Sequence, residues 1–227
     1  MTELLIASGL WIVTHLGISS SGIRPRLVGW LGEGGYLGAY SLLAVATLTF
    51  LILAWADTPR DVWFWAPATW QIWFALLLMP LAFLLLIGGL LGPNPTSVGQ
   101  ETQFDRTDTV TGVMRITRHP VQWAFLVWVV AHVPANGDLP TLTLLAAIAT
   151  VAGVGTILID RKKAGRLGAR WSEFAAATSN VPFAAIFARR NTLVLSELGF
   201  GKVLLALVIY VLAIVSHRWI AGVPIAL

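Results

Sequence analysis

The sequence contains no cysteine and carries little charge. The absence of cysteine among its 227 residues excludes disulfides, thiolate catalysis, iron–sulfur clusters and zinc sites built on cysteine. Charged residues make up only 11% of the chain, against 57% hydrophobic residues, whereas a soluble domain averages roughly 25% charged residues. A chain this poor in charge cannot cover a soluble globule, but it can cover the ends of a helix bundle whose sides face lipid. We therefore expect a single integral membrane domain over residues 1–227.

The sequence also lacks the motifs of several common enzyme classes. It has no metalloprotease helix, no Ser–His–Asp order, no phosphate-binding loop and no glycine-rich dinucleotide motif. The net charge of +4 and the isoelectric point near 10 would suit nucleic acid, but the basic residues gather in loops between apolar runs. That pattern is typical of membrane proteins that keep positive charge on the cytoplasmic side. We expect the lipid bilayer, and no nucleic acid, as a partner.

Six apolar stretches predict an all-α bundle of about six transmembrane helices, because a spanning helix needs roughly 20 mostly apolar residues. They cover residues 4–20, 36–55, 70–91, 121–135, 139–159 and 202–220. Pro80 predicts a kink in the third stretch, and Pro120 stands before the fourth, where a first-turn proline is favourable. Met1 is followed by no basic region of the kind that opens a signal peptide, so we interpret the first stretch as a retained span.

The basic residues are concentrated in alternate loops. Thirteen Lys and Arg residues lie in the loops after the first, third and fifth stretches, whereas the other side has only Arg60 and Arg218. This asymmetry predicts that the three basic loops are cytoplasmic and that both termini are periplasmic.

Residues 160–179, in the last basic loop, predict an interfacial amphipathic helix. Leu167, Trp171, Phe174 and Thr178 fall on one stripe, with basic residues around it. Two interpretations remain open: a helix that lies on anionic lipid, or a lid over a site at the cytoplasmic mouth of the bundle.

Histidines inside the apolar stretches are the first candidates for chemistry, because ionisable groups in a membrane are costly. His15 lies in the first stretch and His132 lies deep in the fourth, while His119 marks the entrance of the fourth and His217 the far end of the sixth. His119 and His132 are separated by roughly 20 Å of helix, so any site with two histidines uses different helices. Haem iron takes such axial ligands, but an ordinary packing role is the alternative for each histidine.

A second group of candidates lies where a basic loop enters the membrane. Arg115, Arg118 and His119 could bind haem propionates or a phosphate-bearing ligand, or could simply keep positive charge on the cytoplasmic side. Trp128 lies on the same face of the fourth helix as His132, so it is a candidate to line a haem pocket. No catalytic residue is predicted.

Several motifs taken together resemble the NnrU family over nearly the whole chain. They are Thr14-His15-Leu16, residues 22–27, residues 32–36, Arg115 to Pro120, Ala131-His132, Asn136-Gly137-Asp138 and Thr178 to Phe183. The family is named for a link to nitric-oxide and nitrite metabolism in denitrifying bacteria. The resemblance therefore implies a protein of the bacterial inner membrane with a possible connection to denitrification.

The resemblance also implies a cofactor, because the family includes a carotenoid cis–trans isomerase that contains haem b. The residues that match its iron ligands are His15 and His132. The implied activity is redox or isomerase chemistry on a lipophilic small molecule or on nitric oxide. In the isomerase a cysteine shortly before the second ligand is thought to exchange with it; Val129 occupies that position here, so a thiolate ligand switch is absent. The expected spans place His15 and His132 at different depths, and His15 with His119 is the alternative pair.

Two other functions remain open on the sequence. One is a non-catalytic accessory role in nitrogen-oxide metabolism. The other is a membrane methyltransferase that uses S-adenosylmethionine, since the Arg-His-Pro entrance and the basic segment after it resemble such enzymes. The acidic residues of their second motif are missing, and only Asp160 and Glu173 are near. The sequence predicts no oligomeric state.

Overall fold

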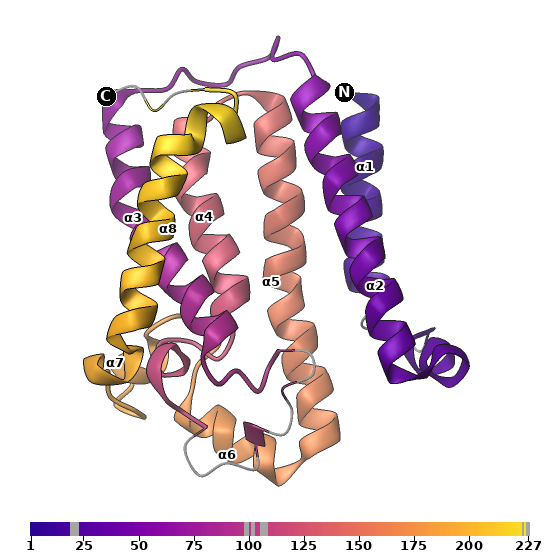
Figure 1. Cartoon of the computed structure of the whole chain (residues 1–227), viewed down its shortest axis with the longest axis vertical. Helices are drawn as coiled ribbons and strands as arrows, with labels where there is room; N and C mark the ends of the chain where they lie inside the picture. The colour runs from indigo at the N-terminus through magenta and orange to yellow at the C-terminus, as the bar shows by residue number, and fades with distance from the viewer. Residues whose placement is uncertain (19–22, 98–99, 101–102, 105–108, 224, 226–227) are drawn as a thin grey trace.

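The computed structural model describes residues 1–18, 23–97, 100, 103–104, 109–223 and 225. Within these ranges the regular structure is helical, apart from an isolated β-bridge between Trp63 and Asp138. The long helices run side by side along the length of the molecule (Figure 1). The prediction of an all-α bundle is confirmed.

The elements fall into long helices and short ones. The long ones, in chain order, are α1 (Thr2–Ile12) with its π-helical continuation η1 (Val13–Ile18), α2 (Ile23–Asp57), α3 (Thr69–Leu91), α4 (Pro120–Ala135), α5 (Leu139–Leu167) and α8 (Phe200–Ile220). The short ones are η3 (Gly112–Arg115), α6 (Ala169–Ala177), α7 (Ala184–Phe187) and η4 (Leu195–Leu198). The predicted third, fourth and sixth stretches match α3, α4 and α8 to within two residues.

Among the residues that the structure describes, four helices are long and apolar enough to cross a membrane, namely α2, α3, α5 and α8. Two further apolar helices, Thr2–Ile18 and Pro120–Ala135, are shorter. They lie beside the longer helices in Figure 1. The predicted six spans therefore correspond to four clear candidates and two shorter helices.

Two predicted boundaries are wrong, because in each case the helix extends beyond its apolar stretch: α2 begins before it and α5 ends after it. α2 begins at Ile23 and runs through a kink at Gly32, whose φ of 70° suits glycine. α5 continues to Leu167 through Arg and Lys, which are good helix formers. The predicted amphipathic helix is therefore two elements, the end of α5 and the separate helix α6, with a break at Gly168 (φ 55°).

α5 holds the two halves of the bundle together. α1 packs on α2 and α5, α4 packs on α5 and α3, and α3 packs on α8. The core between α1, α2 and α5 consists of Leu4, Ala7, Leu51, Ala54, Leu144 and Ala147. The core around α3 and α4 includes Ala82, Leu85, Val113, Ile116, Ala124 and Val127. α5 thus packs between the helices that carry His15 and His132.

A close approach of α3 to α4 fixes the start of α4. A Cβ on Gly89 would lie 2.8 Å from Cγ of Pro120, so only glycine lets the two helices come this near. The approach holds Pro120, and with it the preceding His119, against α3.

Candidate functional site

His15 and His132 share a local arrangement that was not among the sequence-based predictions. Each histidine follows a tryptophan by four residues, as Trp11 to His15 and as Trp128 to His132. In both, the ring Nδ1 lies close to the carbonyl oxygen of that tryptophan, at 2.9 Å and 2.8 Å. The indole packs against the imidazole, with ring centroids 3.7 Å and 4.6 Å apart. The repeated Trp-x-x-x-His spacing, one helical turn, was the feature of the sequence from which this arrangement could have been predicted.

This arrangement suits a metal ligand. A carbonyl oxygen can only accept a hydrogen bond, so Nδ1 carries the proton and donates it, and Nε2 keeps its lone pair. Histidines that bind metals almost always donate their other ring N–H to a carboxylate, a carbonyl or water in this way. The donor chemistry of His15 and of His132 therefore fits residues that would hold haem iron.

His15 lies in aromatic surroundings between α1 and α2. It belongs to the π-helix η1, and π-helical turns are frequent at functional sites. Tyr40 of α2 meets the imidazole edge-on, with centroids 6.0 Å apart, and Tyr36 stacks on Tyr40 at 5.8 Å.

His132 lies near the end of α4 that is remote from the basic loops. Segment 58–68, which connects α2 to α3, covers this end. Three hydrogen bonds attach it: Phe64 N to Gly137 O at 2.8 Å, Leu139 N to Val62 O at 3.0 Å, and Trp65 Nε1 to Pro134 O at 2.7 Å. The Asn136 amide also donates to the carbonyl oxygen of His132 at 2.8 Å.

At the opposite end of α4, Arg118 and His119 meet Asp160 of α5. The Arg118 guanidinium donates to both carboxylate oxygens through Nε, at 3.0 Å and 3.1 Å, and also donates through Nη2. Nε2 of His119 lies 2.6 Å from Oδ1 of Asp160. The His119 ring is fully buried. Burial lowers its pKa more than Asp160 raises it, so the ring is neutral at pH 7 and donates its Nε2–H.

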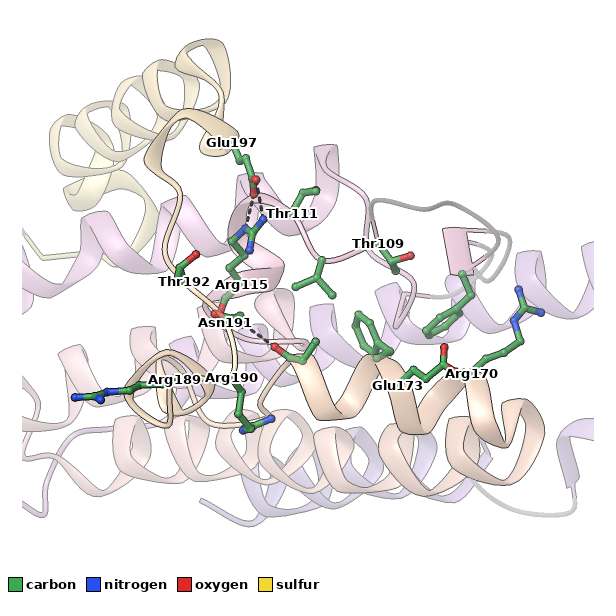
Figure 2. A pocket seen from close by; sticks show the side chains of 14 residues that line it. Thr109, Thr111, Arg115, Arg170, Glu173, Arg189, Arg190, Asn191, Thr192 and Glu197 are labelled. Atoms are coloured by element: carbon green, nitrogen blue, oxygen red, sulfur yellow. Dashed lines mark hydrogen bonds and ion pairs between the residues drawn. The ribbon is translucent and has the colours of Figure 1, made fainter.

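Arg115 belongs to a different ion pair. Its Nε and Nη2 donate to the two carboxylate oxygens of Glu197 at 2.6 Å and 2.8 Å (Figure 2), and the backbone N–H of Gly112 donates to the same group at 3.0 Å. The hydrogen bond from Arg115 lowers the pKa of Glu197. Both candidate arginines, Arg115 and Arg118, thus have a carboxylate partner within the chain. The structure brings Arg118 and His119 together on Asp160, whereas His132 lies near the other end of α4 and Trp128 near its middle.

The stripe predicted on α6 faces the protein. Trp171 and Phe174 are buried against Met114 and pack with Phe104, whose ring centroid is 5.2 Å from that of Phe174. Of the two sequence-based interpretations, this placement agrees with a cover at the basic end of the bundle. A pocket of about 1110 Å³ lies beside α6 (Figure 2).

Among the residues that the structure describes, no three or more His, Cys, Asp or Glu side chains lie close enough together to hold a metal ion. A haem needs only one or two axial side chains, so the test for haem is the chemistry of single histidines.

Fold and composition define the class: an all-helical protein with apolar helices that suit a membrane.

The family follows from comparison with known sequences. Residues 3–225 match the NnrU family, described as NnrU protein, and the chain belongs to this family. Among curated proteins it is similar to 15-cis-zeta-carotene isomerase, chloroplastic, from Arabidopsis thaliana, at 39% identity over 85 residues, or 37% of this chain. The protein of the same name from Zea mays is 35% identical over 91 residues. The match spans 23% of the length of each relative. No solved structure matches the chain.

Proposed function

We propose that the protein is a haem-b-dependent membrane isomerase that acts on a double bond of a lipophilic molecule. The observation that carries the proposal is the pair of Trp-x-x-x-His motifs, in which Nδ1 is bound to a carbonyl oxygen and Nε2 keeps its lone pair. His15 and His132 are the residues that would hold the iron. Because α5 packs between the helices that carry them, binding of one iron by both histidines would require these helices to rearrange. The name of the two relatives, a carotene isomerase, supports isomerisation as the reaction.

Bound haem would supply an iron centre for the isomerisation of a double bond. The chain itself keeps the proton of each histidine on Nδ1, which donates a hydrogen bond to the backbone carbonyl oxygen of Trp11 or of Trp128. The same two indoles pack against the imidazoles and hold their orientation. A hydrogen bond from the ring to a carbonyl also raises the basicity of the ligand nitrogen.

The surroundings of His132 favour a lipophilic substrate. Phe125 and Trp128 lie on the same face of α4 as His132, and Phe125 is 45% exposed at the surface of the bundle. Segment 58–68 covers the nearby end of α4. A substrate would therefore reach this face sideways from the bilayer rather than from water.

The topology is part of the proposal. The shorter apolar helices, of 17 and 16 residues, would be roughly 24–26 Å long at 1.5 Å per residue, close to the hydrocarbon thickness of about 30 Å. We infer that all six cross a bacterial inner membrane, with the basic loops in the cytoplasm and both termini in the periplasm. The residues of the three basic loops that the structure describes lie at one end of the bundle (Figure 1).

The alternative functions have less support. Asp160, one of the few acidic residues available to a methyltransferase, is already bonded to Arg118 and His119. No contact in the described residues favours nitric oxide as the ligand or an accessory role in denitrification over isomerisation.

The proposal is tested by an isomerisation assay. The haem-loaded protein in liposomes is incubated with 15-cis-zeta-carotene in the dark, and the geometric isomers are separated by chromatography. We expect catalytic turnover that falls by more than about 100-fold in His15→Ala and in His132→Ala, since the loss of outer partners alone costs about 10–100-fold in metal sites. His217→Ala is the matched control, because His217 has the same bond from Nδ1 to a carbonyl oxygen, that of Val223 at 2.8 Å, but the residue one turn before it is Ala213 rather than a tryptophan. Full turnover in His132→Ala would contradict the proposal.

A further inference from the structure

The first turns of α2 form a short helix of their own. The backbone of Gly32 has φ 70° and ψ 166°, outside the helical region, so residues 23–31 and 33–57 are two helices with a kink between them. In Figure 1 the first turns of α2 stand out to one side of the bundle. We call residues 23–31 the N-terminal segment of α2.

Contacts across the kink support the angle between the N-terminal segment and the rest of α2. The Arg24 guanidinium donates to the carboxylate of Glu33, and it also lies over the ring of Tyr36, 5.3 Å from the ring centroid. Tyr36 is buried and stacks on Tyr40. The side chain of Arg24 thus joins the two sides of the kink, and the segment keeps its direction away from the bundle.

One face of the N-terminal segment is apolar and exposed. It consists of Ile23, Leu27, Trp30 and Leu31, whose spacing of i, i+4, i+7 and i+8 places them on one side of a helix. Ile23 is 48% exposed, Trp30 is 84% exposed and Leu31 is 52% exposed. The other side of the helix carries Gly29. A contiguous apolar patch of this kind marks an interaction surface, so we expect this face to have a partner.

The length of α2 places the kink at the edge of a bilayer. The helix formed by residues 33–57 is roughly 38 Å long at 1.5 Å per residue, which covers the hydrocarbon core of about 30 Å and little more. At its far end Trp55 has the Arg60 guanidinium 4.9 Å from its ring, and tryptophan is enriched at membrane interfaces. The N-terminal segment therefore lies at the other interface, beside the headgroups of the leaflet on the basic side.

We infer that the N-terminal segment lies in the headgroup layer of this leaflet, parallel to the bilayer surface, with Ile23, Trp30 and Leu31 among the acyl chains. Its apolar face continues the lipid-facing surface of α2, where Leu42 is 74% exposed. Arg26 is exposed at the edge of this face, where its guanidinium would bind lipid phosphates. The inference rests on α2 crossing the membrane, which is part of the proposed topology, and not on haem or on isomerase activity.

Spin labels on single cysteines test the inference, because the chain has no cysteine of its own. The full chain with Ile23→Cys, Trp30→Cys or Gly29→Cys is labelled and placed in liposomes of phosphatidylcholine and phosphatidylglycerol. Collisions of the label with oxygen, which enters the bilayer, are compared with collisions with a water-soluble nickel chelate, and their ratio gives the depth of the label. We expect the labels at positions 23 and 30 to lie about 5–10 Å below the lipid phosphates, and the label at position 29 to lie in water.

Gly29→Cys is the matched control, because it lies on the other side of the same helix and a Cβ at Gly29 would meet nothing within 4 Å. Leu42→Cys reports whether α2 crosses the bilayer, so that failure of the proposed topology is distinguished from failure of this inference. With the Leu42→Cys label inside the bilayer, equal access of the nickel chelate to positions 23, 29 and 30 would overturn the inference. Spin–spin broadening at Trp30→Cys that disappears on dilution with unlabelled protein would place a second copy on this face, and would overturn lipid as its partner.

Discussion

Asp160→Ala should lower the midpoint of thermal unfolding in detergent by roughly 10 °C. The Asp160 carboxylate binds Arg118 and the fully buried His119 at once, and its own side chain is only 18% exposed. Removing one partner of a buried ion pair typically costs about 3–5 kcal/mol, because the other charge stays buried without compensation. For a chain of this size each kcal/mol shifts the midpoint by about 2–4 °C.

The matched variant is Glu197→Ala, which breaks the ion pair with Arg115. This pair is more open to solvent, with side chains 21% and 27% exposed, and pairs near a surface contribute only about 0–1 kcal/mol. We expect its midpoint to fall by no more than roughly 4 °C. If Asp160→Ala unfolded at the same temperature as Glu197→Ala or above it, the Asp160 cluster would not be the main polar contact between α4 and α5.

Gly137→Ala should destabilise the protein by about 3 kcal/mol. A Cβ at position 137 would overlap the backbone carbonyl of Trp65, and a backbone group cannot move aside as a flexible side chain can. Segment 58–68 would have to leave its place on α4, with loss of the hydrogen bonds that join Gly137 to Phe64 and Leu139 to Val62. Overpacking costs about 1–3 kcal/mol, and breaking such contacts adds to it.

The control is Gly155→Ala on α5, where an added Cβ would meet nothing within 4 Å. That substitution should be neutral or should stabilise the helix by up to about 1 kcal/mol. Thermal unfolding gives the comparison, and limited proteolysis between residues 58 and 68 reports the release of the segment. Equal stability and equal cleavage of the two variants would mean that segment 58–68 is not held in place by its close contact with Gly137.

Most of the fold could be predicted because the chain is so apolar. Runs of apolar residues placed α3, α4 and α8 to within two residues. The predicted boundaries were wrong where a segment is helical without being continuously apolar. The end of α5 is charged yet helical, and the first turns of α2 precede the kink at Gly32.

The candidate site was predictable only in part. His15 and His132 stood out because ionisable groups are rare in apolar helices, and the tryptophan one turn before each of them was visible in the sequence. The partnership of His119 with Asp160 was not visible, because the two residues are 41 positions apart and meet only through the packing of α4 on α5. The pocket beside α6 likewise requires the fold, since its described walls come from Phe104, residues 109–115, α6 and the 189–197 segment.

The central claim is that His15 and His132 hold a haem, and an absorption spectrum of the detergent-purified protein tests it most directly. The protein is produced with ample haem, and the spectrum is recorded in the oxidised and then the reduced state, beside His15→Ala, His132→Ala and the control His217→Ala. We expect sharp α and β bands on reduction in the wild type and the control, and their loss in the other two variants. A featureless wild-type spectrum, or bands that survive in His15→Ala and His132→Ala, would contradict the claim.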